Sequence, residues 1–247
     1  MTRSRRGDVR TEFRNALAAT DAPADPELLP VRLAKAGAAL LAVDGVGLSL
    51  FDGDFRVPLG ANTDMATLAE RLQFTQGEGP CMAAGIDHRI SASDEAQLEL
   101  EWPRYAEALF EQTPYRAILS VPLAIARGTR GAIDLFLVDS DGLEDVSLAE
   151  AARLADEIAD TLRQVNEDSG TAAYPSDSDQ VAWLQGPGAQ ARSAVWVAIG
   201  ILMAKFELTS ADALALLRGF SYMQDVLLDD AAADLVAGRL SVDELRP

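Results

Sequence analysis

Histidine and cysteine are nearly absent from this chain of 247 residues, which contains one of each, His88 and Cys81. A single cysteine excludes an internal disulfide and a metal site of clustered thiolates, and a single histidine excludes a site that needs two. We therefore expect a reducing compartment, no resident metal and no enzymatic activity. The simplest interpretation makes His88 a surface residue and Cys81 a small buried residue, with sensing by the Cys81 thiol as the alternative.

Long apolar runs are missing too. The longest spans residues 193–204 between Arg192 and Lys205, whereas a membrane-spanning helix needs about 20 residues. No apolar core follows the arginines near the start, as it would in an export signal. We expect a soluble, cytoplasmic protein with no membrane contact. The net charge of -18 opposes nonspecific attraction to nucleic acid, so a polyanionic partner would need a local basic patch.

The pattern of apolar residues predicts an α/β region followed by a helical one. Helical spacing and β-forming runs predict helices at 28–43, 65–74 and 102–112, and strands at 46–51, 56–61, 117–126 and 131–138. The polar residues 1–25 are expected to form a loosely ordered lead-in, in which only residues 11–19 have the pattern of a short helix. Residues 75–81, rich in glycine and ending in Pro80 and Cys81, are expected to form a connecting or binding loop.

A stripe with alternating spacings of three and four residues follows. Its members are Leu148, Ala151, Ala155, Ile158, Leu162 and Val165. This spacing is typical of the seam of a coiled coil, so it predicts a homodimer joined through these residues. The segment 169–179, which contains Pro175 among small and polar residues, is expected to be a linker between two domains.

Beyond the linker the sequence predicts three helices, at 189–206, 210–223 and 229–237. Ser210 is a candidate cap for the second of them. Helices this short are marginal alone, so we expect them to pack together or against a partner.

Six short stretches in the first part of the chain, taken in order, resemble a GAF domain of the kind found in actinobacterial regulators. They are residues 29–33, 47–50, 72–81, 101–105, 121–123 and 131–135. The resemblance implies an α/β domain with an antiparallel sheet flanked by helices, and a role in sensing. The expected lining of a small-molecule pocket is Phe51, Phe74, Cys81, Trp102 and Phe136, with ordinary core packing as the alternative for these residues. The ligand and any cofactor remain unspecified.

The end of the chain resembles an ANTAR domain, the three-helix RNA-binding module of transcription antitermination regulators. The resemblance lies in residues 198–203, 208–213 and 216–218, with Leu228 and Ala232. It implies binding to RNA hairpins, for which the candidate residues are Arg218, Lys205, Arg192 and Ser221. Arg218 is the strongest candidate because a guanidinium suits bidentate contacts with phosphate or base edges. The alternative for Arg218 is a salt bridge within the domain, to Asp212, Asp229 or another nearby acid.

Together these features predict four segments: a lead-in at 1–25, a GAF sensor with its signalling helix at 26–168, a linker at 169–179 and an all-α ANTAR domain at 180–247. The predicted function is signal-responsive RNA binding that controls transcription termination. From Gln180 onward five basic residues face eight acidic ones, a net charge of -3. This balance keeps a second hypothesis open, a dimeric regulatory scaffold whose helical domain binds protein.

Overall fold

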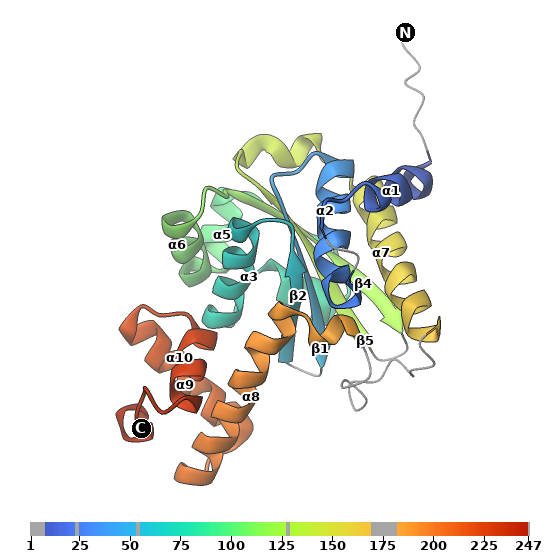
Figure 1. Cartoon of the computed structure of the whole chain (residues 1–247). Coiled ribbons are helices and arrows are strands. Elements are labelled where there is room, and N and C mark those ends of the chain that lie inside the picture. The colour runs from blue at the N-terminus through green and yellow to red at the C-terminus, as the bar shows by residue number, and fades with distance from the viewer. Residues whose placement is uncertain (1–7, 23–24, 53–54, 127–128, 169–181, 247) are drawn as a thin grey trace.

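The computed structural model describes residues 8–22, 25–52, 55–126, 129–168 and 182–246. Its central element is an antiparallel sheet of five strands in the order β2-β1-β5-β4-β3 (Figure 1). The strands are β1 (Gly45–Asp52), β2 (Phe55–Ala61), β3 (Ser91–Ser93), β4 (Ala117–Ala126) and β5 (Thr129–Leu137). The two longest runs of β-forming residues thus became the paired strands β4 and β5, as predicted.

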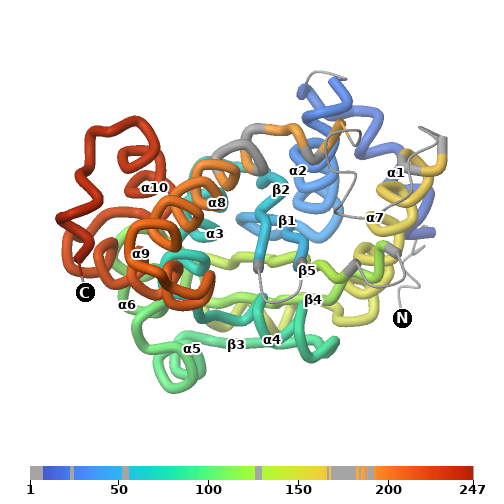
Figure 2. The backbone as a smooth tube through the Cα atoms, turned by 90° about the horizontal axis from the view of Figure 1, so that it is seen from below, coloured from blue at the N-terminus to red at the C-terminus, as the bar shows by residue number. Residues whose placement is uncertain are grey.

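Helices cover both faces of this sheet (Figure 2). One face carries α1 (Val9–Ala18), α2 (Leu29–Leu41) and α7 (Leu148–Asp168), and the other carries α3 (Asp64–Gln76), α4 (Pro80–Asp87), α5 (Glu95–Glu101) and α6 (Pro103–Gln112). Alternate residues of β4 supply the two cores, because Leu119 and Val121 pack under α7 while Ile118 packs under α6. This confirms the predicted antiparallel sheet flanked by helices. We call residues 8–168 the sheet domain.

Residues 187–246 form a second cluster of helices, the C-terminal unit, while Trp183 in the preceding segment is buried in the core of the sheet domain. Its helices are α8 (Pro187–Phe206), α9 (Ser210–Gln224) and α10 (Leu228–Val236). They share a core of their own, to which Leu202, Leu217 and Leu235 contribute, and their bounds lie within two residues of the predicted ones. The cap of α9 is Thr209 rather than Ser210, since the Thr209 hydroxyl accepts the backbone N–H of Asp212 at 3.2 Å.

Short 3-10 helices complete the described chain at Pro26–Leu28, Ser140–Asp145, Ala182–Gln185 and Val242–Leu245. No single helix in the described ranges is both long and apolar enough to cross a membrane. Residues 192–206 and 210–224 meet that requirement only when taken as a pair, and the pair is bent by 107°.

The described part of the expected lead-in is ordered. Residues 9–18 form α1, which packs against α2 and α7, and Phe13 is fully buried in the core of the sheet domain. The short helical pattern at 11–19 therefore corresponds to α1, and the expectation of loose order is corrected for these residues. The apolar positions Val9 and Phe13 are four residues apart, which places both on one face of a helix.

The expected loop at 75–81 is shorter than predicted. The helix α3 continues to Gln76 and ends where Gly77 adopts a left-handed φ of 71°. The next helix then begins at Pro80. Glycine just after a helix and proline at the first helical position are both favourable, so the same residues that predicted a loop instead separate two helices.

The expected dimer seam on α7 faces the chain's own core. Of its residues, Ala151, Ala155, Ile158 and Leu162 are buried beneath β4 and against α1 and α2, Val165 packs at the edge of this core, and Leu148 is 50% exposed. An amphipathic helix that covers a sheet needs the same spacing as a coiled coil, which explains the correction. Homodimerisation remains a prediction without support from this stripe. The expected linker at 169–179 lies outside the described residues.

This packing predicts a stability effect. Leu162→Ala should lower the free energy of unfolding by about 2–5 kcal/mol, because it leaves a cavity between α7 and the sheet. Arg163→Ala, a neighbouring change on the exposed side of α7, should alter it by no more than about 0.5 kcal/mol. Urea unfolding followed by circular dichroism measures both. Equal effects of the two substitutions would contradict the packing described for α7.

Candidate functional site

A cluster of buried charged side chains lies between the sheet and α3. Arg56 of β2 forms an ion pair with the carboxylate of Glu70 on α3, and it also donates from Nη1 to the Glu70 carbonyl oxygen at 2.7 Å. Asp134 of β5 lies 3.8 Å from the same guanidinium. All three side chains are buried. Charged side chains are rarely buried unless they are paired. Removing one member of this cluster would therefore leave the others buried without a partner.

Neutral side chains hold the two carboxylates in place. Ser49 of β1 donates to Glu70 Oε2 at 2.8 Å, and Ser120 of β4 donates to Asp134 Oδ1. Gln73, one turn along α3 from Glu70, donates to Asp134 Oδ2 at 2.7 Å. The cluster thereby connects α3 to four adjacent strands of the sheet.

The charges of this cluster do not balance, because two carboxylates face one guanidinium. The pKa of Glu70 is raised to about 8, chiefly by burial; Arg56 opposes the rise and the nearby charge of Asp134 adds to it. The Glu70 carboxyl consequently retains a proton at pH values where an exposed glutamate has lost it. A buried group with a shifted pKa is often found at functional sites, which makes the cluster a candidate for sensing.

Cys81 lies beside this cluster. Its backbone N–H donates to Gln73 Oε1 at 3.1 Å, and its side chain is fully buried. Burial raises the pKa of the Cys81 thiol well above its usual value, with a smaller contribution from Asp134 and Glu70, so the thiol stays protonated. A protonated, inaccessible thiol favours the interpretation of Cys81 as a small buried residue.

The five expected pocket residues are not brought together. Phe51 of β1 packs against Cys81 and Ala84 of α4. Phe136 instead stacks on Tyr115, with ring centroids 5.0 Å apart. Trp102 packs at the edge of that second cluster, and Phe74 points to the C-terminal unit. The expectation of one pocket lined by these residues is corrected in favour of core packing in separate clusters.

The outer side of α3 contacts the C-terminal unit. The Arg71 guanidinium donates to both carboxylate oxygens of Asp229, at 2.8 and 3.1 Å, and to Asp230 at 2.6 Å. Thr75 accepts the backbone N–H of Leu228 at 3.1 Å through its hydroxyl. These bonds attach the first turn of α10 to α3. We call the contact of α3 with α8, α9 and α10 the α3 interface.

Phe74 lies at the centre of the α3 interface. Its side chain is 4% exposed and packs within the core of the C-terminal unit. The guanidinium carbon of Arg192 on α8 lies 3.2 Å from the centre of the Phe74 ring, and Arg192 Nη1 donates to the carbonyl oxygen of Arg56 at 2.9 Å. A guanidinium over an aromatic face is held by cation–π attraction, which is strongest away from water.

Arg218 of α9 also contacts Phe74. Its Nε and Nη2 donate to the Phe74 carbonyl oxygen at 3.4 and 3.3 Å, and burial lowers the pKa of the Arg218 guanidinium from its ordinary value. Within the described part of the chain no carboxylate lies at ion-pair distance from Arg218, so the alternative salt bridge to Asp212 or Asp229 is not formed. Its cation instead caps the C-terminal end of α3, where helix carbonyls are unpaired.

The other two expected RNA-binding residues differ in exposure. Ser221 is buried, and its hydroxyl has no hydrogen-bond partner in the described structure; it lines a cleft of about 290 Å³ between α3, α6 and α9. Lys205 is half exposed, with Nζ 3.6 Å from a carboxylate oxygen of Asp243. Three of the four expected residues, Arg192, Arg218 and Ser221, therefore lie at the α3 interface.

Sequence reasoning missed the buried cluster. Arg56 and Asp134 each interrupt an apolar strand pattern, and Glu70 follows the buried Ala69 in α3. A charged residue inside an otherwise apolar strand pattern was the signal that could have indicated this cluster. Burying a charge is costly unless a partner is near, so such a residue predicts a buried partner. The contacts of Arg71 with Asp229 and Asp230 had no comparable signal, since the pairs are far apart in sequence.

No protein-family model and no curated protein sequence matches the chain. Among solved structures, the chain is similar to the GAF domain from a phosphoenolpyruvate-protein phosphotransferase of Coxiella burnetii, with 16% sequence identity and a TM-score of 0.46. The match covers 66% of this chain and 95% of that domain. A likeness this distant leaves the contacts within the chain as the basis for its function.

The described ranges contain no group of three or more His, Cys, Asp and Glu side chains arranged to hold a metal ion. His88 is exposed and ends α4 with a left-handed φ of 55°.

The raised pKa of Glu70 predicts a dependence of stability on pH. Between pH 4.5 and about 8 the folded protein holds a proton on Glu70 that the unfolded chain releases, so the contribution of Glu70 to stability falls as pH rises through this range. Glu70→Gln, which is neutral throughout, should flatten the decline in the free energy of unfolding. Glu107→Gln on the exposed side of α6 serves as the control and should leave it unchanged. Parallel profiles for the parent and Glu70→Gln would contradict the assignment.

Proposed function

We propose that the chain is a signal-responsive regulator. In this proposal the sheet domain is a sensor of the GAF type and the C-terminal unit is an RNA-binding output of the ANTAR type that controls transcription termination. The proposal is supported by the two resemblances in the sequence, and by an antiparallel sheet flanked by helices that is followed by three helices close to their expected positions. The net charge of -18 requires that RNA meet a local set of cations.

The observation that carries the proposal is the shared contact of Arg192 and Arg218 with Phe74. Both arginines are the cations that the ANTAR resemblance assigns to RNA. With their guanidinium groups against α3, neither can form a bidentate contact with phosphate. The described arrangement is therefore the state with low RNA affinity, and RNA binding requires the C-terminal unit to leave α3.

A signal can reach the α3 interface through α3 itself. Glu70 and Gln73 face the buried cluster in the sheet domain, while Arg71 and Phe74 face the C-terminal unit. Because a helix is a stiff element, a shift of α3 caused by a change in the cluster moves both sets of contacts together. This gives the two-state element that coupling between two sites requires.

Loosening the α3 interface should raise RNA affinity. The double substitution Asp229→Asn and Asp230→Asn removes the ion pairs with Arg71. Charge-assisted bonds that are partly buried are worth about 1–3 kcal/mol, so we expect roughly a tenfold gain in affinity for RNA hairpins. Sequencing of RNA that copurifies with the parent and the variant identifies the hairpins, and fluorescence anisotropy then measures their affinity.

A second double substitution controls for charge. Asp234→Asn with Glu207→Gln removes two negative charges from the same unit outside the α3 interface, and should raise affinity far less. Adding Arg218→Gln to the loosened variant should weaken binding by roughly 1–3 kcal/mol. Equal gains from the two double variants would show that only net charge matters. If no hairpin copurifies with either the parent or the loosened variant, the proposal of RNA binding is overturned.

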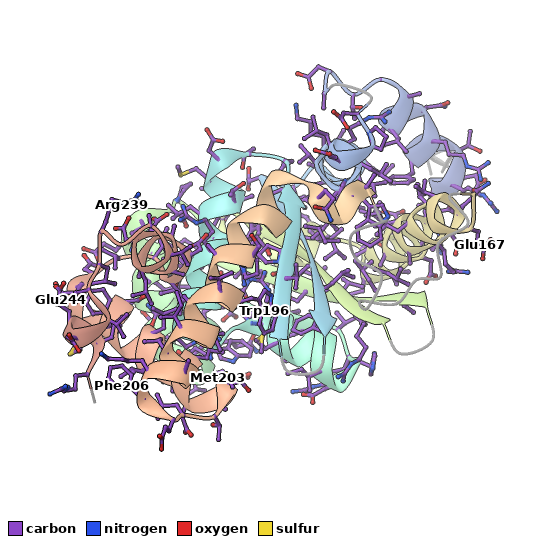
Figure 3. All side chains as sticks on the ribbon, turned by 60° about the horizontal axis from the view of Figure 1, so that its bottom comes forward. Glu167, Trp196, Met203, Phe206, Arg239 and Glu244 are labelled. Atoms are coloured by element: carbon purple, nitrogen blue, oxygen red, sulfur yellow. The ribbon has the colours of Figure 1, made fainter. Side chains whose placement is uncertain are left out.

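A specific surface favours the alternative, an output unit that binds protein. The exposed side of α8 carries Trp196, Val197, Gly200 and Met203, at helical spacing on one face; Trp196 and Met203 are labelled in Figure 3. Exposed apolar surface of this kind often marks a protein contact. Copurification of a protein that is lost in Val197→Glu, with no enrichment of RNA, would support this alternative over the first proposal.

A further inference from the structure

A cavity of about 450 Å³ lies where the two parts of the chain meet. Its walls come from β2 and α3 on one side and from α8 and α10 on the other. The apolar part of the lining is formed by Val31, Pro58, Leu59, Ala61, Ala194 and Ala233. This volume and this lining suit a small organic molecule.

Arg192 lines this cavity and has no counter-ion. The side chain is 3% exposed, Nη1 donates to the Arg56 carbonyl oxygen, and Nε has no hydrogen-bond partner. No carboxylate of the described residues lies within ion-pair distance of it. Burial lowers the pKa of Arg192 well below its ordinary value, and the positive charge of Arg56 lowers it further. The Phe74 ring contacts this buried guanidinium, but no anion among the described residues balances its charge, which is costly in a buried position.

The other charged groups in the lining are already paired. Arg71 is bound to Asp229 and Asp230, and the Glu70 carboxyl accepts from Arg56 and Ser49 through Oε2. The free Oε1 of Glu70 packs against Gly47 of β1, where even a Cβ atom would come within 2.2 Å of it. Of the charged residues that line the cavity in the described structure, Arg192 is thus the one whose charge no carboxylate balances.

We propose that this cavity binds a small organic anion whose carboxylate or phosphate pairs with the Arg192 guanidinium while its apolar body fills the space between Leu59 and Ala233. Since the walls belong to both parts of the chain, the bound anion stabilises the arrangement in which the C-terminal unit rests on α3. The site is independent of whether the C-terminal unit binds RNA or protein, and it goes beyond the proposed function by assigning a ligand class and place.

Isothermal titration of the full chain tests this site. The probes are benzoate, hexanoate and phenyl phosphate, each at constant ionic strength, and the matched uncharged probes are benzamide and hexanamide. The anions should bind and raise the melting temperature, and the amides should bind at least about tenfold more weakly, since a hydrogen bond to a charged group is worth roughly 1.5–3 kcal/mol. If no anion of the set binds, or if amides bind as well as anions, the proposal is overturned.

Two variants locate the binding. Arg192→Gln removes the cation, and Ala233→Phe fills the cavity but keeps Arg192; each should reduce anion affinity at least about tenfold. Arg239→Gln removes an exposed arginine of the same unit and should leave binding unchanged. Circular dichroism verifies folding, and if Arg192→Gln unfolds, Ala233→Phe decides. Binding retained in folded Ala233→Phe would place the anion elsewhere. These results do not depend on RNA affinity, so the two proposals can fail separately.

Discussion

The contact of Arg192 with Phe74 is the interaction on which the arrangement of the two parts depends. One guanidinium from α8 lies against an aromatic ring of α3 and donates to a backbone carbonyl of β2. It thereby joins the C-terminal unit to both a helix and an edge strand of the sheet domain. The contact is also costly, because the cation is buried without a carboxylate in the described structure. Because the attraction and the cost of the unbalanced charge oppose each other, a small change in free energy is enough to move the C-terminal unit between contact with α3 and release from it.

The helix α3 lies between the buried charge cluster and the C-terminal unit, so it contacts both. Its inner face belongs to a buried charge cluster with an unbalanced second carboxylate, and its outer face holds the C-terminal unit through an ion pair and a ring contact. In the proposed function, the protonation of Glu70, the position of α3 and the exposure of Arg192 are linked through this one helix. Such a link needs no large motion inside the sheet domain, only a change in how firmly α3 is held.

Much of the fold could be predicted because apolar spacing reports local structure directly. The strands β4 and β5 and the helices α8, α9 and α10 follow from periodicity alone. Periodicity does not predict what an apolar face packs against. The stripe that contains Ile158 and Leu162 suits a coiled coil and a helix that covers a sheet equally. The candidate site was least predictable, because Arg192 contacts a residue 136 positions away, and its surroundings exist only after folding.

Distance measurement between spin labels on α6 and α9 tests the central claim most directly. Glu107→Cys and Tyr222→Cys place labels on exposed residues that border the same cleft, and Cys81 is fully buried and should not react. The account predicts one narrow distribution of short distances in the parent, and a broad distribution extending to longer distances after Asp229→Asn with Asp230→Asn. A broad distribution in the parent itself would contradict an arrangement in which α3 holds the C-terminal unit.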